Sequence, residues 1–187
     1  MVITVTFVRN AATRLFFTKK VVRNASVVIQ NAKIVLMDNG FTFLGGKKQK
    51  KSQLIFEVLG DLDELNVVLG LVKIFSSSKK LQNKILLLQE NLLEMGSFLA
   101  TAKKVDFQVK TDFLEKEVKL MKDIFLKRFS QPGVNKTSTF LHLARVICRR
   151  LERKIVALKK PQSLSLMVYC NRLSSYLFWL AKKEEKI

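Results

Sequence analysis

The sequence predicts an all-α protein, a single up-and-down bundle of five helices. Three observations support this fold class. Hydrophobic residues make up 48% of the 187 residues, whereas glycine and proline number only 7 and 2, a composition that favours a helical globular protein. Apolar residues recur at helical spacing in five long segments, and short connections with turn-forming residues separate these segments. A chain of this length suits one domain with a sizeable core.

The first three helical segments are expected at Leu54–Phe75, Leu81–Ala102 and Phe113–Phe129. Gly60 and Gly70 interrupt the first segment at roughly 1 kcal/mol each, which suggests that another helix or a ligand packs closely there. We interpret the second and third segments as scaffold, joined by a polar connection at Lys103–Thr111. The charges of the third segment predict i,i+4 pairs on a solvated surface. Pro132 and Gly133 then prevent the helix from continuing.

The fourth segment, Thr137–Leu158, has two contrasting faces. Its apolar stripe consists of Phe140, Ala144, Ile147, Leu151, Ile155 and Leu158. At 100° per residue, the opposite side collects His142, Arg145, Arg149, Glu152 and Arg153. The fifth segment follows at Leu164–Lys183, where Asn171 and Arg172 interrupt an apolar setting.

The polar face of the fourth segment uses arginine, although lysine is the usual basic residue of this chain. The four arginines are Arg145, Arg149, Arg150 and Arg153. A planar guanidinium group binds phosphate or carboxylate in a bidentate manner, so the pattern indicates a polyphosphate site or a buried ion pair. A solvated surface face is the alternative.

Residues 1–36 form a basic leader without any aspartate or glutamate, and the globular domain is expected at 37–187. Arginine, lysine, serine and threonine among apolar residues are typical of a mitochondrial targeting segment, which predicts the mitochondrial matrix, with the cytoplasm as the alternative location. A disordered basic tail, or short strands at Val27–Ile29 and Ile34–Leu36, would explain the same composition.

Composition also argues against several classes of protein. No window holds 18 uninterrupted apolar residues, so we expect no membrane span. Cys148 and Cys170 are too few for a disulfide framework, and Cys148 and His142 lack the partners of a zinc site, so we expect no metal held by protein ligands alone. The net charge of +19 predicts a polyanionic partner by default.

The stretch Asp38–Gly46 is rich in glycine and precedes a run of lysines that ends at Lys51. Its Asn-Gly and Gly-Gly pairs predict a loop whose backbone amides approach a ligand closely.

Four motifs resemble the cobalamin adenosyltransferases of the PduO type, in the order and at the spacing of that family. Leu141–Arg153 resembles the signature L-H-x-A-R-x-x-C-R-R-x-E-R, and Gly60–Asn66 resembles G-D-V-D-E-L-N. Phe129–Gly133 resembles F-I-L-P-G, and Tyr169–Phe178 resembles Y-L-N-R-L-S-D-x-L-F. The resemblance spans about residues 38–183.

The resemblance implies a five-helix bundle assembled as a homotrimer, with sites between subunits, that transfers the 5′-deoxyadenosyl group of ATP to cob(I)alamin and releases triphosphate. It implies that MgATP and cobalamin are the substrates, with Mg²⁺ on the phosphates, and that a corrinoid reductase and an adenosylcobalamin-dependent mutase are possible partners. The implied ATP-binding residues are Lys51, Arg149, Arg150, Glu152, Arg153, Asn171, Thr42 and Gly40. Asp63 and Arg145 match an interface ion pair that positions the corrinoid, and Phe129 matches the aromatic residue below the cobalt.

The sequence departs from the family mainly at its phosphate loop. Ile34–Gly40 replaces T-R-T-G-D-D-G and keeps only Asp38 and Gly40, while Ser175 replaces an aspartate. A divergent relative that binds corrinoid or a partner without turnover is therefore a second hypothesis. A basic nucleic-acid-binding helical module is the third, although no aromatic ribonucleoprotein motif or zinc finger supports it.

Overall fold

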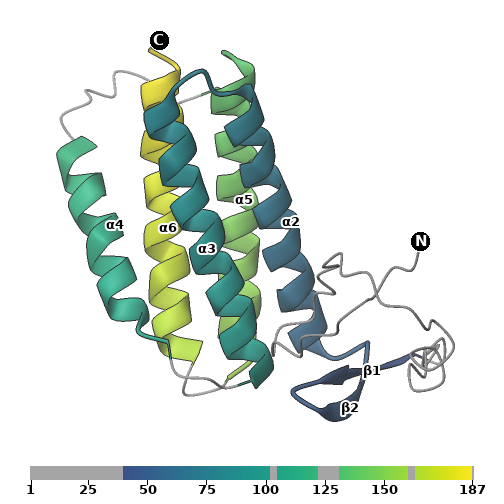
Figure 1. Ribbon diagram of the computed structural model, residues 1–187. Coiled ribbons are helices and arrows are strands. Elements are labelled where there is room, and N and C mark those ends of the chain that lie inside the picture. Colours follow the sequence, from purple (N-terminus) through teal and green to yellow (C-terminus); the bar gives the residue numbers. More distant parts are fainter. Residues whose placement is uncertain (1–39, 102–104, 122–130, 160–162, 187) are drawn as a thin grey trace, which may run out of the picture. The chain divides into compact units, whose positions relative to one another are not determined.

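A computed structural model describes residues 40–101, 105–121, 131–159 and 163–186 of the chain (Figure 1). The predicted leader at 1–36 and the predicted strands within it lie outside these residues. The remaining chain divides into two units, a short hairpin before Gln53 and a helical bundle that begins there, which are described separately.

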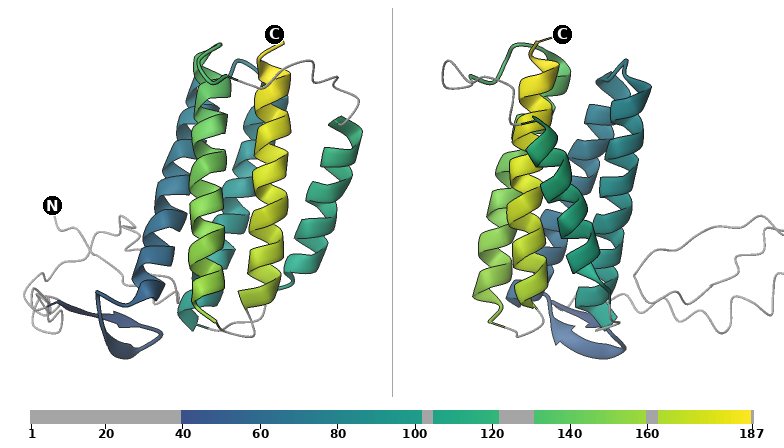
Figure 2. Two further views of the ribbon diagram at one scale, coloured as in Figure 1. Left: turned by 180° about the vertical axis from the view of Figure 1, so that it is seen from behind. Right: turned by 90° about the vertical axis from the view of Figure 1, so that its left-hand side faces the viewer.

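The bundle contains five helices, as predicted. They are α2 (Leu54–Phe75), α3 (Lys79–Thr101), α4 (Phe107–Met121), α5 (Lys136–Ala157) and α6 (Ser163–Glu184). The helices run side by side with alternating directions along the bundle (Figures 1 and 2). Helix α5 packs against both α2 and α6, while α4 packs against α6 and α3 against α2. Among the described residues, no helix combines the length and apolar character needed to span a membrane.

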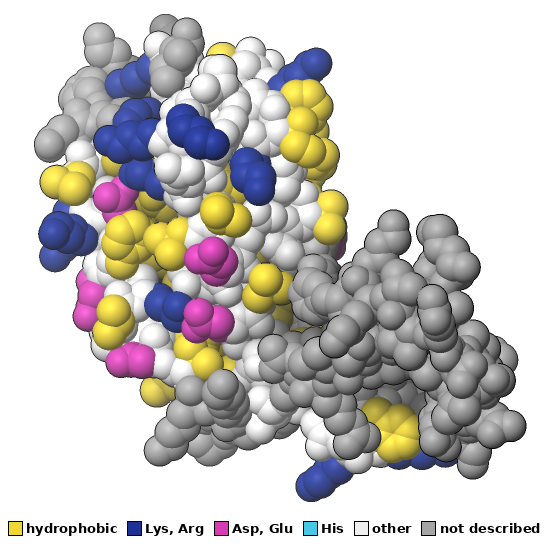
Figure 3. All heavy atoms as spheres, in the orientation of Figure 1, with side chains coloured by type: hydrophobic (Ala, Val, Ile, Leu, Met, Phe, Trp, Pro, Cys, Tyr) yellow, Lys and Arg dark blue, Asp and Glu magenta, His cyan; other side chains and the backbone are white. Residues whose placement is uncertain are grey.

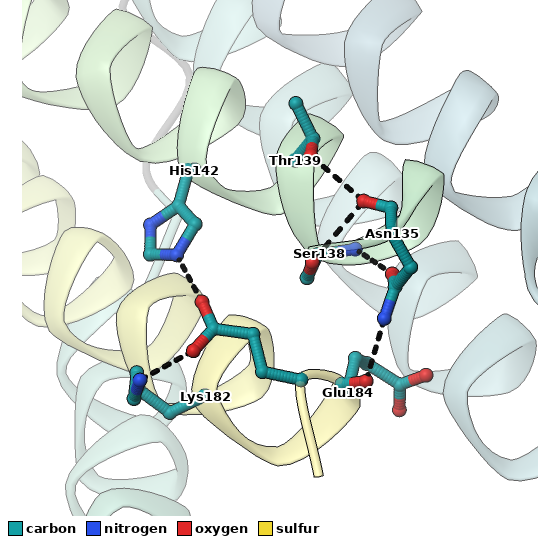
Figure 4. Close-up of polar contacts among 7 residues, drawn as sticks. Asn135, Ser138, Thr139, His142, Lys182 and Glu184 are labelled. Carbon is teal, nitrogen blue, oxygen red and sulfur yellow. Dashed lines mark hydrogen bonds and ion pairs between the residues drawn. The ribbon is translucent and has the colours of Figure 1, made fainter. Parts of the chain in front are cut away.

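Polar side chains define two of the helix starts. Ser78 Oγ accepts a hydrogen bond from the Leu81 amide at 3.3 Å, so α3 begins slightly earlier than predicted. Asn135 Oδ1 accepts one from the Ser138 amide at 2.8 Å and caps α5, while Asn135 Nδ2 donates to the Glu184 carbonyl at 2.8 Å (Figure 4). Asn135 therefore both starts α5 and ties it to the end of α6.

Helix α4 begins at Phe107, earlier than the predicted Phe113, so the prediction of a polar connection up to Thr111 is wrong. Phe107 is 1% exposed and meets the rings of Phe98 and Tyr169 edge-on at 6.1 and 5.5 Å. Burial of this one ring outweighs the polar character of its neighbours. The predicted end of this helix at Phe129 lies outside the described residues.

The charges of α4 pair with neighbouring helices, where the sequence predicted i,i+4 pairs along its surface. Glu115 Oε1 lies 2.6 Å from Arg172 Nε on α6, and Glu117 forms an ion pair with Lys84 on α3. Burial raises the pKa of Glu117, but the hydrogen bond and charge of Lys84 outweigh it, so the net pKa is lowered. These carboxylates fasten α4 to its neighbours.

The predicted apolar stripe of α5 is largely confirmed, but the placement of His142 on the polar face is wrong. Ala144, Ile147, Leu151 and Ile155 are buried, and Phe140 and Leu158 pack partly against the core. His142 is only 3% exposed, and its Nε2 lies 2.8 Å from Glu185 Oε1, which also pairs with Lys182 (Figure 4). Because α5 contacts two helices, its buried side is wider than one stripe.

The two glycines of α2 have no tight neighbour in the described chain. A Cβ atom at Gly60 would meet nothing within 4 Å, and one at Gly70 would meet only Gln89 Nε2 at 3.7 Å. Packing against another helix of the same chain therefore does not explain them.

The glycine-rich stretch forms an antiparallel hairpin instead of a loop, so the fold is not purely helical. Strand β1 (Phe41–Leu44) pairs with β2 (Lys47–Lys50), and Gly45 and Gly46 form the two-residue turn with φ of 56° and 77°. Such a turn needs positive φ at both central residues, which glycine adopts without strain.

Candidate functional site

Glu152 is the centre of the polar face of α5. Its Oε2 lies 2.8 Å from Arg149 Nη1, and its Oε1 accepts a hydrogen bond from Asn171 Nδ2 on α6 at 3.0 Å. The Glu152 side chain is 14% exposed and that of Arg149 is 48% exposed. Arg153 is exposed and donates from Nη1 to the Arg149 carbonyl at 3.1 Å. The structure thus brings together four residues that the sequence nominated: Arg149, Glu152, Arg153 and Asn171.

This arrangement leaves exposed cationic groups whose orientation is fixed by the less exposed Glu152 carboxylate. The half-buried carboxylate accepts from both neighbours, so it orients Arg149 and Asn171 relative to each other. An exposed guanidinium group held in this way presents its remaining N–H groups to an anion.

Arg150 points to a different group of acids, on α2. Its Nε lies 3.2 Å from Asp61 Oδ2, and its Nη2 pairs with Glu64. Asp61 is 6% exposed and also lies 3.2 Å from Lys154 Nζ through its Oδ1. The hydrogen bond that Arg150 donates to Asp61 raises the pKa of Arg150 above its already high usual value, so the guanidinium stays charged. The Arg150 side chain is 39% exposed, so the arginine pattern's predicted ion pair is present here with only its carboxylate buried.

Asp63 and Arg145 do not form an ion pair with each other within the chain. Asp63 is exposed, and no described residue forms a hydrogen bond or ion pair with it. The buried Nε of Arg145 likewise lacks a hydrogen-bond partner among the described residues. Asp63 is thus accessible to a partner outside the described chain, whereas Arg145 Nε is enclosed without a hydrogen-bond partner within it.

Comparison with known proteins adds the decisive observation. The family model described as cobalamin adenosyltransferase matches residues 37–184. The chain belongs to this family. It is 34% identical over 161 residues to the corrinoid adenosyltransferase of Bacillus subtilis, covering 78% of this chain and 81% of the relative. It is 33% identical over 163 residues to human corrinoid adenosyltransferase MMAB, covering 78% of this chain and 65% of the relative.

Solved structures agree with this assignment. A PduO-type adenosyltransferase of Lactobacillus reuteri, in an arginine-to-lysine variant complexed with ATP, has a TM-score of 0.74 at 30% identity and covers 80% of this chain and 91% of its own. A phenylalanine-to-alanine variant complexed with cobalamin and ATP has a TM-score of 0.73 at 29% identity and covers 80% and 90%. The resemblance stated from the four motifs is confirmed.

The remaining predicted site residues lie in the hairpin unit or outside the described chain. Gly40 has φ of 77°, and its carbonyl accepts a hydrogen bond from the Lys51 amide at 2.8 Å. Thr42 is half-buried on β1 opposite Gln49, and Lys51 is exposed just after β2. Phe129 lies outside the described residues.

Two buried free cysteines adjoin site residues in the sequence. Cys148 and Cys170 precede Arg149 and Asn171 in sequence, and Cys148 Sγ donates to the Cys170 carbonyl at 3.2 Å. The hydrogen bond with Cys148, together with burial, raises the pKa of the Cys170 thiol well above its usual range. A neutral buried thiol is a packing residue and not a nucleophile.

Sequence reasoning missed Asp61 and Glu64 as members of the site. The signal was present, because the Gly60–Asn66 stretch concentrates acids in a chain that has few of them. The family pattern implies a role for Asp63 alone, so it predicts only that aspartate as a site residue. Their pairing with Arg150 requires residues that are 86 and 89 positions apart.

Proposed function

We propose that this protein transfers the 5′-deoxyadenosyl group of ATP to cob(I)alamin, giving adenosylcobalamin and triphosphate. The observation that carries the proposal is the fixed set of Arg149, Glu152 and Asn171 on α5 and α6, in a chain of this family. Relatives bear the name corrinoid adenosyltransferase, and similar structures are complexed with ATP and cobalamin.

The residues suit the chemistry of this transfer. Cobalt(I) supplies the electron pair of the new cobalt–carbon bond, and triphosphate leaves with the electron pair of the broken carbon–oxygen bond. Negative charge grows on the leaving group, and oriented guanidinium groups stabilise it. We assign ATP binding to Lys51, Arg149, Arg150, Arg153, Asn171, Thr42 and Gly40, with Glu152 orienting its neighbours and Mg²⁺ entering on the phosphates.

We further propose that the protein is a homotrimer with its sites between subunits. Exposed apolar side chains lie along α2 and α5, where Val67, Ile74 and Val146 are 65%, 74% and 52% exposed. Hydrophobic side chains are visible at the surface along the α2 edge of the bundle (Figure 3). Such residues next to the unpaired Asp63 and Arg145 fit a surface that pairs with another copy of the chain.

The trimer has a direct test in sedimentation velocity. The native chain should sediment at three times the monomer mass, and Arg145→Ala should shift the population towards smaller species. A native chain that sediments only as a monomer at micromolar concentration would contradict the trimer. In the trimer, Phe129 is assigned to the lower face of the cobalt, where it keeps the axial ligand away.

The altered phosphate loop at Ile34–Gly40 supports a second candidate, a relative that binds corrinoid or a partner without turnover. The nucleic-acid hypothesis gains no support, because Arg149 and Arg150 pair with carboxylates and do not extend a continuous basic surface. The mitochondrial location, the leader at 1–36 and the reductase and mutase partners stay predictions.

Absorbance spectroscopy separates these candidates. The chain is mixed with MgATP and chemically reduced cobalamin, and the spectrum of adenosylcobalamin is followed with time. Product formation supports the enzyme, whereas bound corrinoid without product supports the second candidate. If the chain neither binds corrinoid nor forms product, both candidates are excluded.

A further inference from the structure

Two carboxylates of α2 hold the same guanidinium group, but they differ in burial. The Asp61 side chain is 8% exposed, and its Oδ2 lies 3.2 Å from Arg150 Nε. The Glu64 side chain is 49% exposed and pairs with Arg150 Nη2. A buried side chain is confined by its packing, whereas an exposed one changes rotamer at little cost. Asp61 is thus a fixed partner of Arg150 and Glu64 a mobile one.

Asp61 is also anchored independently of Arg150. Its other oxygen lies 3.2 Å from Lys154 Nζ, one helical turn further along α5. Lys154 in turn lies 3.3 Å from Glu57 on α2. With both oxygens engaged, Asp61 cannot rotate away from Arg150 without breaking contacts on both sides. The Nε edge of the guanidinium is therefore held in one orientation, which directs the terminal Nη groups outwards.

The terminal nitrogens are the ones that an anion can reach. No described residue accepts a hydrogen bond from Arg150 Nη1, and the partner of Nη2 is the exposed Glu64. A triphosphate carries more charge and more acceptor oxygens than one carboxylate, so it competes well for these two nitrogens. It has no such access to the Nε that Asp61 holds.

We propose that Asp61 is a positioning residue that fixes Arg150 for the phosphates of ATP, and that Glu64 holds the phosphate position on Arg150 until ATP displaces it. This inference rests on the proposed function, because it takes Arg150 as an ATP ligand. It deepens that function by giving two carboxylates at one arginine opposite effects on nucleotide affinity.

The two carboxylates should have opposite effects on ATP affinity, and this difference distinguishes positioning of Arg150 from simple charge repulsion. Both residues are negative and close to the same arginine, so repulsion alone predicts that removing either charge tightens ATP binding. Under the proposal, Glu64→Gln removes a competitor and tightens binding about twofold to fivefold, the range expected for one exposed ion pair. Asp61→Asn lets the guanidinium turn away and weakens binding by at least about tenfold, the lower end of the range for a lost hydrogen bond to a charged group.

Lys154→Met provides the matched control for a merely structural effect. This substitution breaks the other contact of Asp61, and so loosens the same α2–α5 contact, without touching Arg150. It should lower the melting temperature as Asp61→Asn does, but weaken ATP binding less than Asp61→Asn does, because Asp61 stays buried and keeps its bond to Arg150 Nε. A second control is Glu64→Gln in an Arg150→Ala background, where the tightening should disappear.

Titration calorimetry of MgATP into the full chain and these variants tests the inference. Tighter binding by Glu64→Gln, weaker binding by Asp61→Asn and a smaller weakening by Lys154→Met are the expected results. Tightening by both carboxylate variants overturns the inference in favour of plain repulsion. Equal weakening by Asp61→Asn and Lys154→Met, or no change in any variant, overturns it as well. Absence of ATP binding by the native chain is a different outcome, since it removes the proposed function itself.

Discussion

The substitution Glu152→Gln tests the core of the site, because it changes one oxygen to a nitrogen without changing shape. Glu152 accepts hydrogen bonds from Arg149 and Asn171 at 2.8 and 3.0 Å. An amide has only one acceptor oxygen, so one of the two donors must lose its partner. A hydrogen bond to a charged group contributes about 1.5–3 kcal/mol, and exposed ion pairs about 0.2–1 kcal/mol.

The exposure of this contact places its free-energy contribution between those two ranges. The Glu152 side chain is 14% exposed, but Arg149 is 48% exposed and therefore partly screened. A loss of about 1–2 kcal/mol in transition-state stabilisation is reasonable, which corresponds to roughly a fivefold to thirtyfold fall in kcat/KM. The assay is the initial rate of adenosylcobalamin formation at varied ATP concentration.

A matched variant controls for the loss of one carboxylate. Glu94→Gln removes the charge that lies 3.2 Å from Lys110, on a pair of helices away from Arg149. It should leave kcat/KM within about twofold. If Glu152→Gln also stays within twofold of the native chain, Glu152 does not orient the arginine and the reasoning is refuted.

Three further predictions concern the scaffold. Phe107→Ala should lower the free energy of unfolding by about 3–5 kcal/mol, because it empties the space between two aromatic rings. Chemical denaturation measures this change, and a loss below about 1 kcal/mol would show that Phe107 is not a core residue. Glu117 has a lowered pKa, so its stabilising effect is present above the usual value of 4.5 and is lost as the pH falls below it. Glu117→Gln should therefore reduce the acid dependence of the melting temperature. An unchanged profile of melting temperature against pH would contradict the Lys84 pair. Asn135→Ala should cost about 1 kcal/mol through the lost cap, and a neutral result in thermal denaturation would argue against it.

Local signals in the sequence were sufficient for most of the helices. Helix α2 has the predicted bounds Leu54–Phe75, because apolar periodicity and a following run of serines mark it clearly. The start of α4 could not be predicted in the same way, since Val105, Phe107 and Val109 alternate with polar residues and do not follow helical spacing. Phe107 acquires its importance from Tyr169, which is distant in sequence.

In the site, too, contacts between residues close in sequence could be predicted, whereas contacts between distant residues could not. The Arg149–Glu152 pair lies within one helical turn, so spacing alone nominated it. The partners of Arg150 lie on another helix, and periodicity on α5 cannot tell which acid it meets. The burial of His142 against Glu185 was missed for this reason too, because helical position says nothing about a second neighbouring helix.

Label transfer tests the central claim most directly. The full chain is incubated with Mg²⁺, chemically reduced cobalamin and ATP labelled in its adenosine part, and the products are separated and identified by mass spectrometry. The account predicts labelled adenosylcobalamin and intact triphosphate in equal amounts, formed only when all reactants are present. Cobalamin that remains unlabelled while corrinoid and ATP are both bound would contradict it.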